Sequence, residues 1–270
     1  MLYNIYNNCY ILKRKYIKKK MLELDKIYCC DVLEGLKQLD DNSIDLIITS
    51  PPYNKKGFNG GSSKVRDCDL WHHTIDYGGD ENVDNMPEEA YEQWQIDVIN
   101  ECIRVLKPDG SFFYNHKNRV KKNQMVSPLK WIEKSKAICR QQITWDRSSS
   151  PNMDKCRYVP CTEYLFWLIK QHKNPKFKRL DGDIPFPTEV WKFGPEQKNS
   201  HPAPFPIKLP DNIIPCVAQG EDIVILDPFM GSGTVAVSAI KNKCHYIGFE
   251  KFQEYIDMAN ERIEKIKEND

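Results

Sequence analysis

A short motif, Ser50-Pro51-Pro52-Tyr53, combines residue types that could bind a flat substrate carrying an NH2 group. It follows the apolar run 44–48, whose β-branched residues indicate a buried strand of a parallel sheet. Such sheets bind ligands just beyond the carboxyl ends of their strands. The two prolines fix the backbone and leave carbonyl groups that can only accept hydrogen bonds. A proline-rich turn without a chemical role is the alternative interpretation.

A glycine turn near the other end of the chain points to a nucleotide-type cofactor. The apolar run 223–227 leads into Gly231 and Gly233, then a predicted helix over 235–243 and a predicted strand over 245–249 that ends at Glu250. Glycines let the backbone approach a ligand, and an acid at a strand end accepts hydrogen bonds from ribose hydroxyls. A dinucleotide site usually has a third glycine for the pyrophosphate, whereas S-adenosylmethionine has no phosphate. The turn is therefore compatible with S-adenosylmethionine, and the rest of the chain must decide which cofactor binds.

Both motifs resemble those of one family. Ser50-Pro51-Pro52-Tyr53 resembles the catalytic tetrapeptide of amino-methyltransferases, which methylate exocyclic amines of DNA bases with S-adenosylmethionine, and residues 227–233 resemble the cofactor motif of that family. The catalytic motif comes first, which is the permuted order of the beta class. The resemblance covers about residues 24–266. It implies an α/β fold of Rossmann-like methyltransferase type, with a mostly parallel central sheet and helices on both faces.

The resemblance also implies roles for individual residues. The catalytic residues are Ser50, Pro51, Pro52 and Tyr53. For Asp31, which matches an acid near the adenine of the cofactor, the cap of a helix over 32–39 is an equal alternative. The residues implied to bind S-adenosylmethionine are Asp31, Pro202, Phe205, Asp227, Pro228, Phe229, Gly231, Gly233, Thr234 and Glu250.

A mechanism follows from the chemistry of the amine. An exocyclic amine is a poor nucleophile because its lone pair is delocalised into the ring. Hydrogen bonds from the amine to the Ser50 hydroxyl and the Pro51 carbonyl would favour a pyramidal nitrogen that attacks the methyl group directly. The base must leave the helix stack to reach these groups, and we expect the Tyr53 ring to stack on it.

The residue before Pro-Pro-Tyr bears on the identity of the base. In the family, Asp is common at this position in adenine-N6 enzymes and Ser is frequent in cytosine-N4 enzymes. A serine hydroxyl can also donate to the cytosine ring nitrogen N3, which an ionised aspartate cannot do. We therefore expect a site-specific cytosine-N4 DNA methyltransferase. The alternatives are an adenine-N6 enzyme, an RNA or protein-glutamine methyltransferase, and a non-catalytic nucleic-acid-binding module.

The chain divides into an expected disordered basic extension over 1–22 and a methyltransferase domain over 23–270. Translation could start at Met1 or at Met21. Within the domain we expect an inserted loop at about 54–85 and a target-recognition segment at about 171–200. The expected elements are a βαβ unit over 26–48, a helix over 87–106 that residues 108–110 end, and strands over 111–115, 139–146 and 162–170.

Double-stranded DNA is the expected partner, and local basic patches must bind it because the net charge is only +1. For these patches a solvated surface is the alternative interpretation. The candidate phosphate contacts are Lys55, Lys56, Arg119, Lys121, Lys122, Arg147, Lys173, Lys176, Lys178 and Arg179.

Composition limits the setting of the protein. Ten cysteines occur without metal-ligand spacing, so reduced thiols, a cytoplasmic location and no metal are expected. No apolar run reaches the roughly eighteen residues that a membrane span needs. The resemblance allows a cognate restriction endonuclease as partner and leaves monomer and homodimer open.

Overall fold

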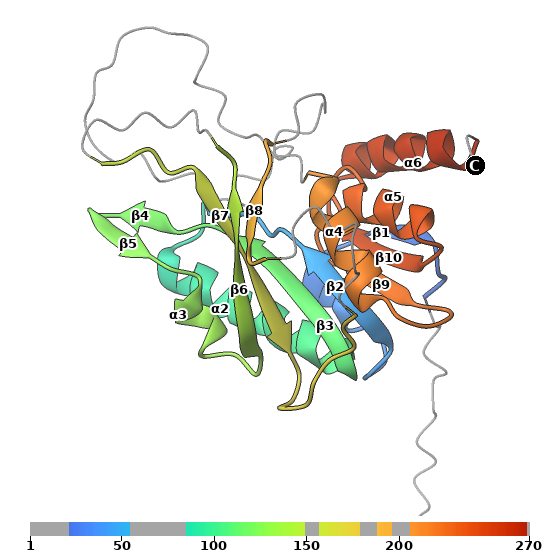
Figure 1. The fold of residues 1–270 in the computed structure, drawn as a ribbon, viewed down its shortest axis with the longest axis horizontal. Helices are drawn as coiled ribbons and strands as arrows, with labels where there is room; N and C mark the ends of the chain where they lie inside the picture. The colour runs from blue at the N-terminus through green and yellow to red at the C-terminus, as the bar shows by residue number, and fades with distance from the viewer. Residues whose placement is uncertain (1–21, 55–84, 149–156, 179–187, 196–205, 269–270) are drawn as a thin grey trace, which may run out of the picture.

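One eight-stranded sheet, with the strand order β1-β10-β9-β2-β3-β7-β6-β8, organises the chain (Figure 1). The computed structural model describes residues 22–54, 85–148, 157–178, 188–195 and 206–268. The basic extension up to residue 21, most of the predicted inserted loop and much of the predicted target-recognition segment lie outside these residues.

Five neighbouring strands of the sheet are parallel: β1 (Lys26–Cys29), β10 (His245–Glu250), β9 (Val224–Asp227), β2 (Ile44–Thr49) and β3 (Leu106–His116). The next strand, β7 (Thr162–Ile169), is antiparallel to both β3 and β6 (Ile138–Asp146). The edge strand β8 (Val190–Lys192) is parallel to β6. A separate hairpin of β4 (Arg119–Lys121) and β5 (Gln124–Val126) follows β3.

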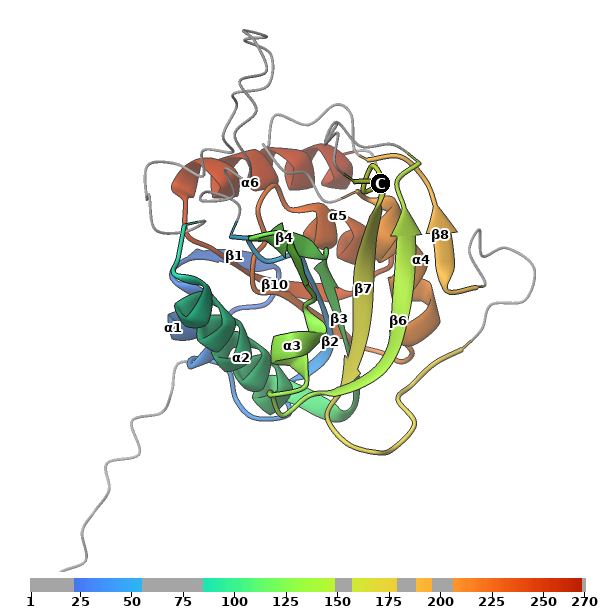
Figure 2. The same ribbon diagram turned by 90° about the vertical axis from the view of Figure 1, so that its left-hand side faces the viewer.

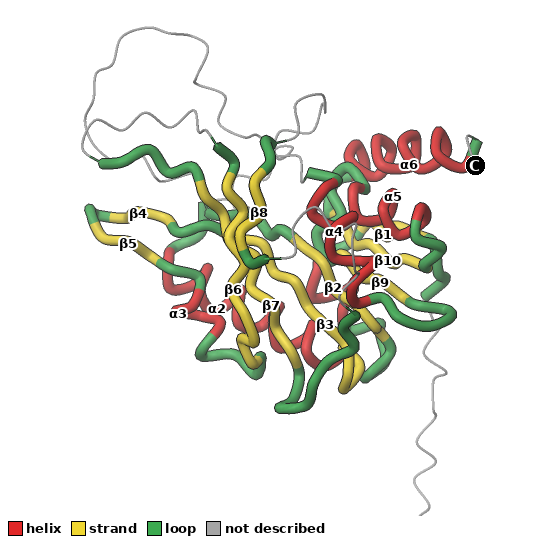
Figure 3. The backbone as a smooth tube through the Cα atoms, in the orientation of Figure 1, coloured by secondary structure: helices red, strands yellow, loops and turns green. Residues whose placement is uncertain are grey.

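Helices cover both faces of the sheet, as Figures 2 and 3 show. Helices α1 (Val32–Leu36), α2 (Glu88–Val105) and α3 (Leu129–Ile132) contribute to the apolar core on one face. Helices α4 (Lys208–Val217), α5 (Thr234–Lys241) and α6 (Gln253–Lys267) contribute to the core on the other. The predicted fold class is therefore confirmed. Within the described parts of the chain, no helix combines the length and apolar character that crossing a membrane needs.

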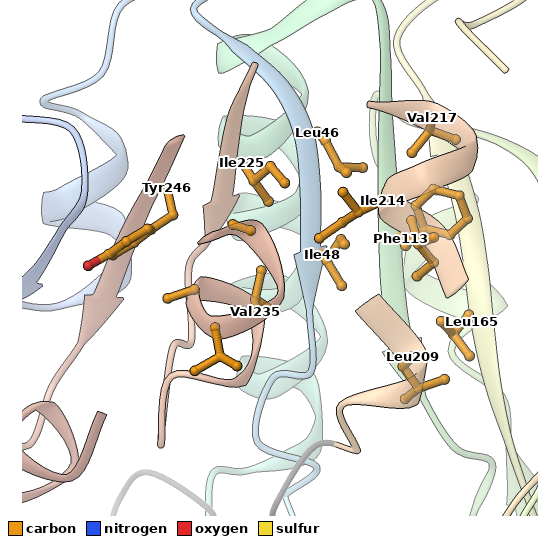
Figure 4. Packing of buried hydrophobic residues seen from close by; sticks show 14 of the residues in the cluster. Leu46, Ile48, Phe113, Leu165, Leu209, Ile214, Val217, Ile225, Val235 and Tyr246 are labelled. Atoms are coloured by element: carbon orange, nitrogen blue, oxygen red, sulfur yellow. The ribbon is translucent and has the colours of Figure 1, made fainter. Parts of the chain in front are cut away.

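The buried strands owe their place to their side chains. In β2, Leu46 and Ile48 belong to the core under α4 and α5, whereas Ile47 belongs to the opposite core. Figure 4 shows Leu46 and Ile48 packed near Ile214 of α4 and Ile225 of β9. An apolar run on both faces is what a strand covered by two helical layers requires.

One expectation about the strands needs correction, whereas the predicted βαβ unit is present as β1, α1 and β2, with β10 and β9 from the C-terminal part of the chain lying between its two strands. The third strand begins at Leu106, not at residue 111. It passes through Pro108, and the pairing of β2 with β3 shifts register between Ile44 and Leu46. This irregularity accommodates a residue that cannot donate a ladder hydrogen bond.

A close contact between α1 and β10 generates the first prediction. A Cβ atom added at Gly35 would lie 2.6 Å from Cδ1 of the fully buried Phe249 ring. We expect Gly35→Ala to lower the free energy of unfolding, because overpacking costs about 1–3 kcal/mol and exceeds the helix gain of about 1 kcal/mol or less. Denaturant unfolding measures the change.

The matched control is Gly194→Ala, since among the described residues no heavy atom beyond its chain neighbours lies within 4 Å of the added Cβ. We expect this variant to stay within about 0.5 kcal/mol of the parent protein. Equal unfolding free energies for both alanine variants would contradict the packing argument.

Candidate active site

The two motifs found in the sequence lie side by side at the carboxyl ends of three neighbouring strands. Ser50 follows β2, Asp227 ends β9 and Glu250 ends β10. Strand β9 pairs with β2 at Leu226 and with β10 at Asp227, so it joins the loop after β2 to the acid after β10. Segments almost 180 residues apart, as the separation of 178 between Thr49 and Asp227 shows, thus form one edge.

A buried hydrogen bond fastens the two motifs together. The Thr49 hydroxyl donates to Asp227 Oδ1 at 2.6 Å, and the Phe229 backbone N–H donates to the same oxygen at 3.0 Å. Burial raises the pKa of Asp227 to about 7, although these two hydrogen bonds act in the opposite direction. The carboxyl therefore fixes the turn after β9 relative to the last residue of β2.

The turn between β9 and α5 needs its glycines. Gly231 and Gly233 have φ values of 49° and 78°, which favour residues without a Cβ atom. A Cβ at Gly233 would also lie 2.8 Å from Cβ of Ala259 in α6. Arg262 of the same helix donates to the Ser232 hydroxyl at 2.9 Å and to the Thr234 hydroxyl at 3.2 Å. The turn is therefore held in shape by α6.

Glu250 is also fixed by the backbone. Its Oε2 accepts from Gly231 N–H at 2.9 Å, and its Oε1 accepts from the N–H groups of Lys251 and Phe252. Burial raises the pKa of Glu250, and the three N–H donors oppose that shift. An acid held beside a glycine turn fits the ribose of a nucleotide-type cofactor.

Asp31 does act as a helix cap. It precedes α1, and its Oδ1 accepts from the Leu33 backbone N–H at 2.9 Å. The neighbouring Cys30 N–H donates to the Glu250 carbonyl, so Asp31 also lies at the edge that carries the other acids. The capping alternative is confirmed, and the adenine contact stays a prediction.

The loop after β2 is organised by a hydrogen-bonded set that the sequence analysis did not foresee. The Tyr53 hydroxyl lies 3.0 Å from the Ser50 hydroxyl and donates to Glu163 Oε2 at 3.0 Å. Asn115 Nδ2 donates to the Tyr53 oxygen at 2.8 Å and to the Ser50 oxygen at 3.3 Å. Arg147 pairs with Glu163 Oε1 at 2.8 Å.

Asn115 and Glu163 come from the two strands that follow β2 in the order of the sheet, β3 and then β7. Asn115 lies near the carboxyl end of β3, and Glu163 lies at the start of the antiparallel strand β7. The sequence held a signal for them, since both are polar residues at the ends of predicted apolar strands. Their meeting depends on β7 running antiparallel to β3, which no local pattern indicates.

Tyr53 is placed differently from the expectation that its ring stacks on a flipped base. Its side chain is buried, and its ring centroid lies 4.3 Å from that of His116. The adjoining Pro52 carbonyl accepts from the Tyr91 hydroxyl at 2.8 Å. In this structure the Tyr53 hydroxyl contacts Ser50 and its ring packs on His116, and stacking on a flipped base stays a prediction.

Two of the predicted phosphate contacts are internal. Arg119 is 4% exposed, forms two hydrogen bonds to Glu88, and its guanidinium lies 4.7 Å from the centroid of the Tyr91 ring. This placement corrects the expectation of a phosphate contact, because the guanidinium binds the start of α2. Arg147 is largely buried and pairs with Glu163 beside Ser50.

Three predicted phosphate contacts lie at the opposite edge of the sheet from Ser50. Lys173, Lys176 and Lys178 follow β7, which ends at the amino edge, and the Lys176 N–H donates to the Asp109 carbonyl there. Strand β7 has eight residues, so at roughly 3.3 Å per residue this edge is about 25 Å from Ser50. These three lysines are therefore remote from Ser50, and their contact with DNA phosphates stays a prediction.

The remaining predicted residues fall into three groups. Lys121 and Lys122 lie in the β4–β5 hairpin that follows the carboxyl end of β3, and Lys121 Nζ lies 3.3 Å from Glu88. Pro51, Pro228 and Phe229 lie in the two loops at the edge. Outside the described residues are Lys55, Lys56, Arg179, Pro202 and Phe205.

A parallel α/β sheet that brings a glycine turn and a Ser-Pro-Pro-Tyr loop to one edge defines the class of Rossmann-like methyltransferases. A family model described as DNA methylase matches residues 44–261. The Type II methyltransferase M.BglII of Bacillus subtilis is 30% identical over 87% of this chain and 68% of that protein. The chain belongs to this family of DNA methylases, and it is an S-adenosylmethionine-dependent DNA methyltransferase.

Solved structures share the fold. The PvuII DNA methyltransferase (cytosine-N4-specific) is similar at a TM-score of 0.67 and 22% identity, over 92% of each chain. The M1.HpyAVI complex with S-adenosylmethionine is similar at a TM-score of 0.59 and 20% identity, over 88% of this chain and 98% of the other.

The buried Asp227 generates the second prediction. Its pKa is about 7 in the folded protein against an ordinary value of 3.8, so the folded chain binds more protons than the unfolded chain between these pH values. Unfolding free energy must then fall as pH rises through this window, by on the order of a few kcal/mol. Asp227→Asn keeps an acceptor for Thr49 and Phe229 but cannot titrate. We expect denaturant unfolding between about pH 4 and pH 7 to show a smaller loss in the variant; equal losses would contradict the assignment.

Proposed function

We propose that this enzyme methylates the N4 amine of a cytosine flipped out of duplex DNA, with Ser50 and the Pro51 carbonyl holding the amine. The observation that carries the proposal is the set of hydrogen bonds that links Ser50 to Tyr53, Asn115 and Glu163. Ser50 follows a central strand of the sheet, and Tyr53 and Asn115 fix its oxygen beside the turn that would carry the cofactor.

The hydrogen bonds around Ser50 determine whether its hydroxyl donates to the substrate or accepts from it. Tyr53 has one hydroxyl hydrogen and donates it to Glu163. The contact between the Ser50 and Tyr53 oxygens therefore uses the Ser50 hydrogen, which leaves the Ser50 oxygen as an acceptor for an N–H group. The amine of a base would meet this acceptor and the Pro51 carbonyl, as attack on a methyl group requires.

This set suits serine better than aspartate at position 50. A carboxylate there would compete with Glu163 for the single Tyr53 hydrogen and place two like charges in one buried set. Serine before Pro-Pro-Tyr is the form frequent in cytosine-N4 enzymes, and the similar PvuII structure is named cytosine-N4-specific. The donation from Ser50 to ring N3, which the sequence suggested, would require the hydroxyl to turn away from Tyr53.

The turn after β9 is the proposed cofactor site. Gly231 and Gly233 would let the backbone approach S-adenosylmethionine, and Glu250 would accept hydrogen bonds from its ribose hydroxyls. The bound cofactor supplies the methyl group. The pairing of β2 with β9 supports a short path from this turn to the amine held at Ser50.

Duplex DNA would approach the carboxyl edge of the sheet. Of the predicted phosphate contacts, Lys121 and Lys122 in the β4–β5 hairpin are the described ones that fit this approach. The relatives are named Type II methyltransferases, which supports a role in restriction and modification beside a cognate endonuclease in the cytoplasm. Such an enzyme could act as a monomer or as a homodimer.

The proposal predicts the product. Incubation with labelled S-adenosylmethionine and duplex DNA that contains the recognition site, followed by digestion to nucleosides, should yield N4-methylcytosine. Ser50→Ala should slow single-turnover transfer about a hundredfold, because a fixed polar partner of the reacting amine is lost. Calorimetry should show unchanged S-adenosylmethionine affinity in this variant. Methyladenine as the sole product would overturn the cytosine assignment.

A further inference from the structure

We propose that Glu163 is the positioning residue that sets the polarity of the Ser50 site and receives the proton released by the methylated amine. The inference rests on the proposed role of Ser50, but it holds for any exocyclic amine. Glu163 acts through Tyr53 and Ser50 and need not touch the substrate.

Glu163 is too buried to be an ordinary solvated carboxylate. The residue is 7% exposed at the start of β7, and the other buried residues of this strand are apolar. A buried carboxylate is costly unless it is paired and hydrogen-bonded. Arg147 supplies the countercharge at one oxygen, and Tyr53 and Asn115 donate to the other at 3.0 and 3.2 Å. Both oxygens are therefore used, and one of them faces the catalytic loop.

The contacts form a directed chain from the reacting position to the carboxylate. Ser50 donates to Tyr53, and Tyr53 donates to Glu163. A carboxylate accepts only, so Glu163 determines the direction of both hydroxyls. Without the charge, the Tyr53 hydrogen could turn toward Ser50, and the Ser50 oxygen would lose its role as an acceptor.

The same chain can carry a proton. When the amine nitrogen forms its bond to the methyl carbon, the carbon–sulfur bond breaks and its electron pair stays on sulfur. The nitrogen becomes positive and must lose a proton. That proton passes to the Ser50 oxygen while the Ser50 hydrogen moves to Tyr53 and the Tyr53 hydrogen moves to Glu163. The neutral methylamine and a protonated carboxyl result, and every atom and charge is accounted for.

His116 is the other base close to this loop, and its contacts direct it elsewhere. Its ring packs on Tyr53, but its Nε2 lies 2.8 Å from the Tyr91 hydroxyl and its Nδ1 lies 2.8 Å from the Lys117 carbonyl. Both ring nitrogens thus face partners away from Ser50. Glu163 is the acid that the chain of hydroxyls reaches.

The test compares Glu163→Gln with a matched control. Glu92 is also 7% exposed and pairs with Lys130, but it lies on α2 and outside this set. We expect Glu163→Gln to slow single-turnover methyl transfer about a hundredfold, within the usual range for general acid–base groups. The affinity for S-adenosylmethionine should stay within about twofold, and Glu92→Gln should keep the parent rate.

A double-mutant cycle distinguishes the loss of the hydrogen-bonded chain Ser50–Tyr53–Glu163 from a general loss of structure. Tyr53→Phe breaks the chain at its middle, so adding Glu163→Gln to it should slow the reaction little further. A Glu163→Gln rate within about threefold of the parent, or multiplied effects in the double variant, would overturn the inference. If Glu163→Gln does not fold, a parent-like rate for Tyr53→Phe would do so. A methyladenine product would refute the cytosine proposal and leave this test intact.

Discussion

The parallel pairing of β2 with β9 is the constraint on which the rest of the site depends. These strands come from opposite ends of the chain and bring the Ser-Pro-Pro-Tyr loop beside the glycine turn. The hydrogen bond from Thr49 to the buried Asp227 fixes the distance between the two loops. Methyl transfer needs two reactants at near-contact separation. The contact between Thr49 and Asp227 therefore determines whether the two motifs form one active site.

Strands β3 and β7, on the side of β2 away from β9, complete the part of the site around Ser50. Strand β3 supplies Asn115, and β7 runs back so that its first residues, including Glu163, return to the same edge. A serine hydroxyl is a weak group by itself. Its orientation here comes from the tyrosine of the same tetrapeptide and from an amide and a carboxylate on two other segments, β3 and β7. The tetrapeptide therefore supplies the groups that hold the amine, and Glu163 on the antiparallel strand β7 orients their hydroxyls.

The sequence predicted what depends on local patterns. Apolar runs located β2, β9 and β10, and the positive φ values of Gly231 and Gly233 agree with a turn that only glycines fit well. What it could not supply was pairing between distant segments. The insertion of β10 and β9 between β1 and β2 is one example. Glu163 is another, since one acid at the start of an apolar strand resembles an ordinary solvated end. Positive charge alone also gave a wrong prediction of a phosphate contact at Arg119. In the sequence this buried arginine and the exposed Lys122 look alike, because both lie in one basic stretch.

The most direct test of the account is the single-turnover methyl-transfer rate of Thr49→Val, measured beside its S-adenosylmethionine and DNA affinities. The substitution keeps the shape of the side chain and removes the hydrogen bond to Asp227. If the junction aligns the two loops, the transfer rate should fall at least about tenfold while both affinities stay within about threefold. An unchanged transfer rate would contradict the claim that this contact makes the two motifs one site.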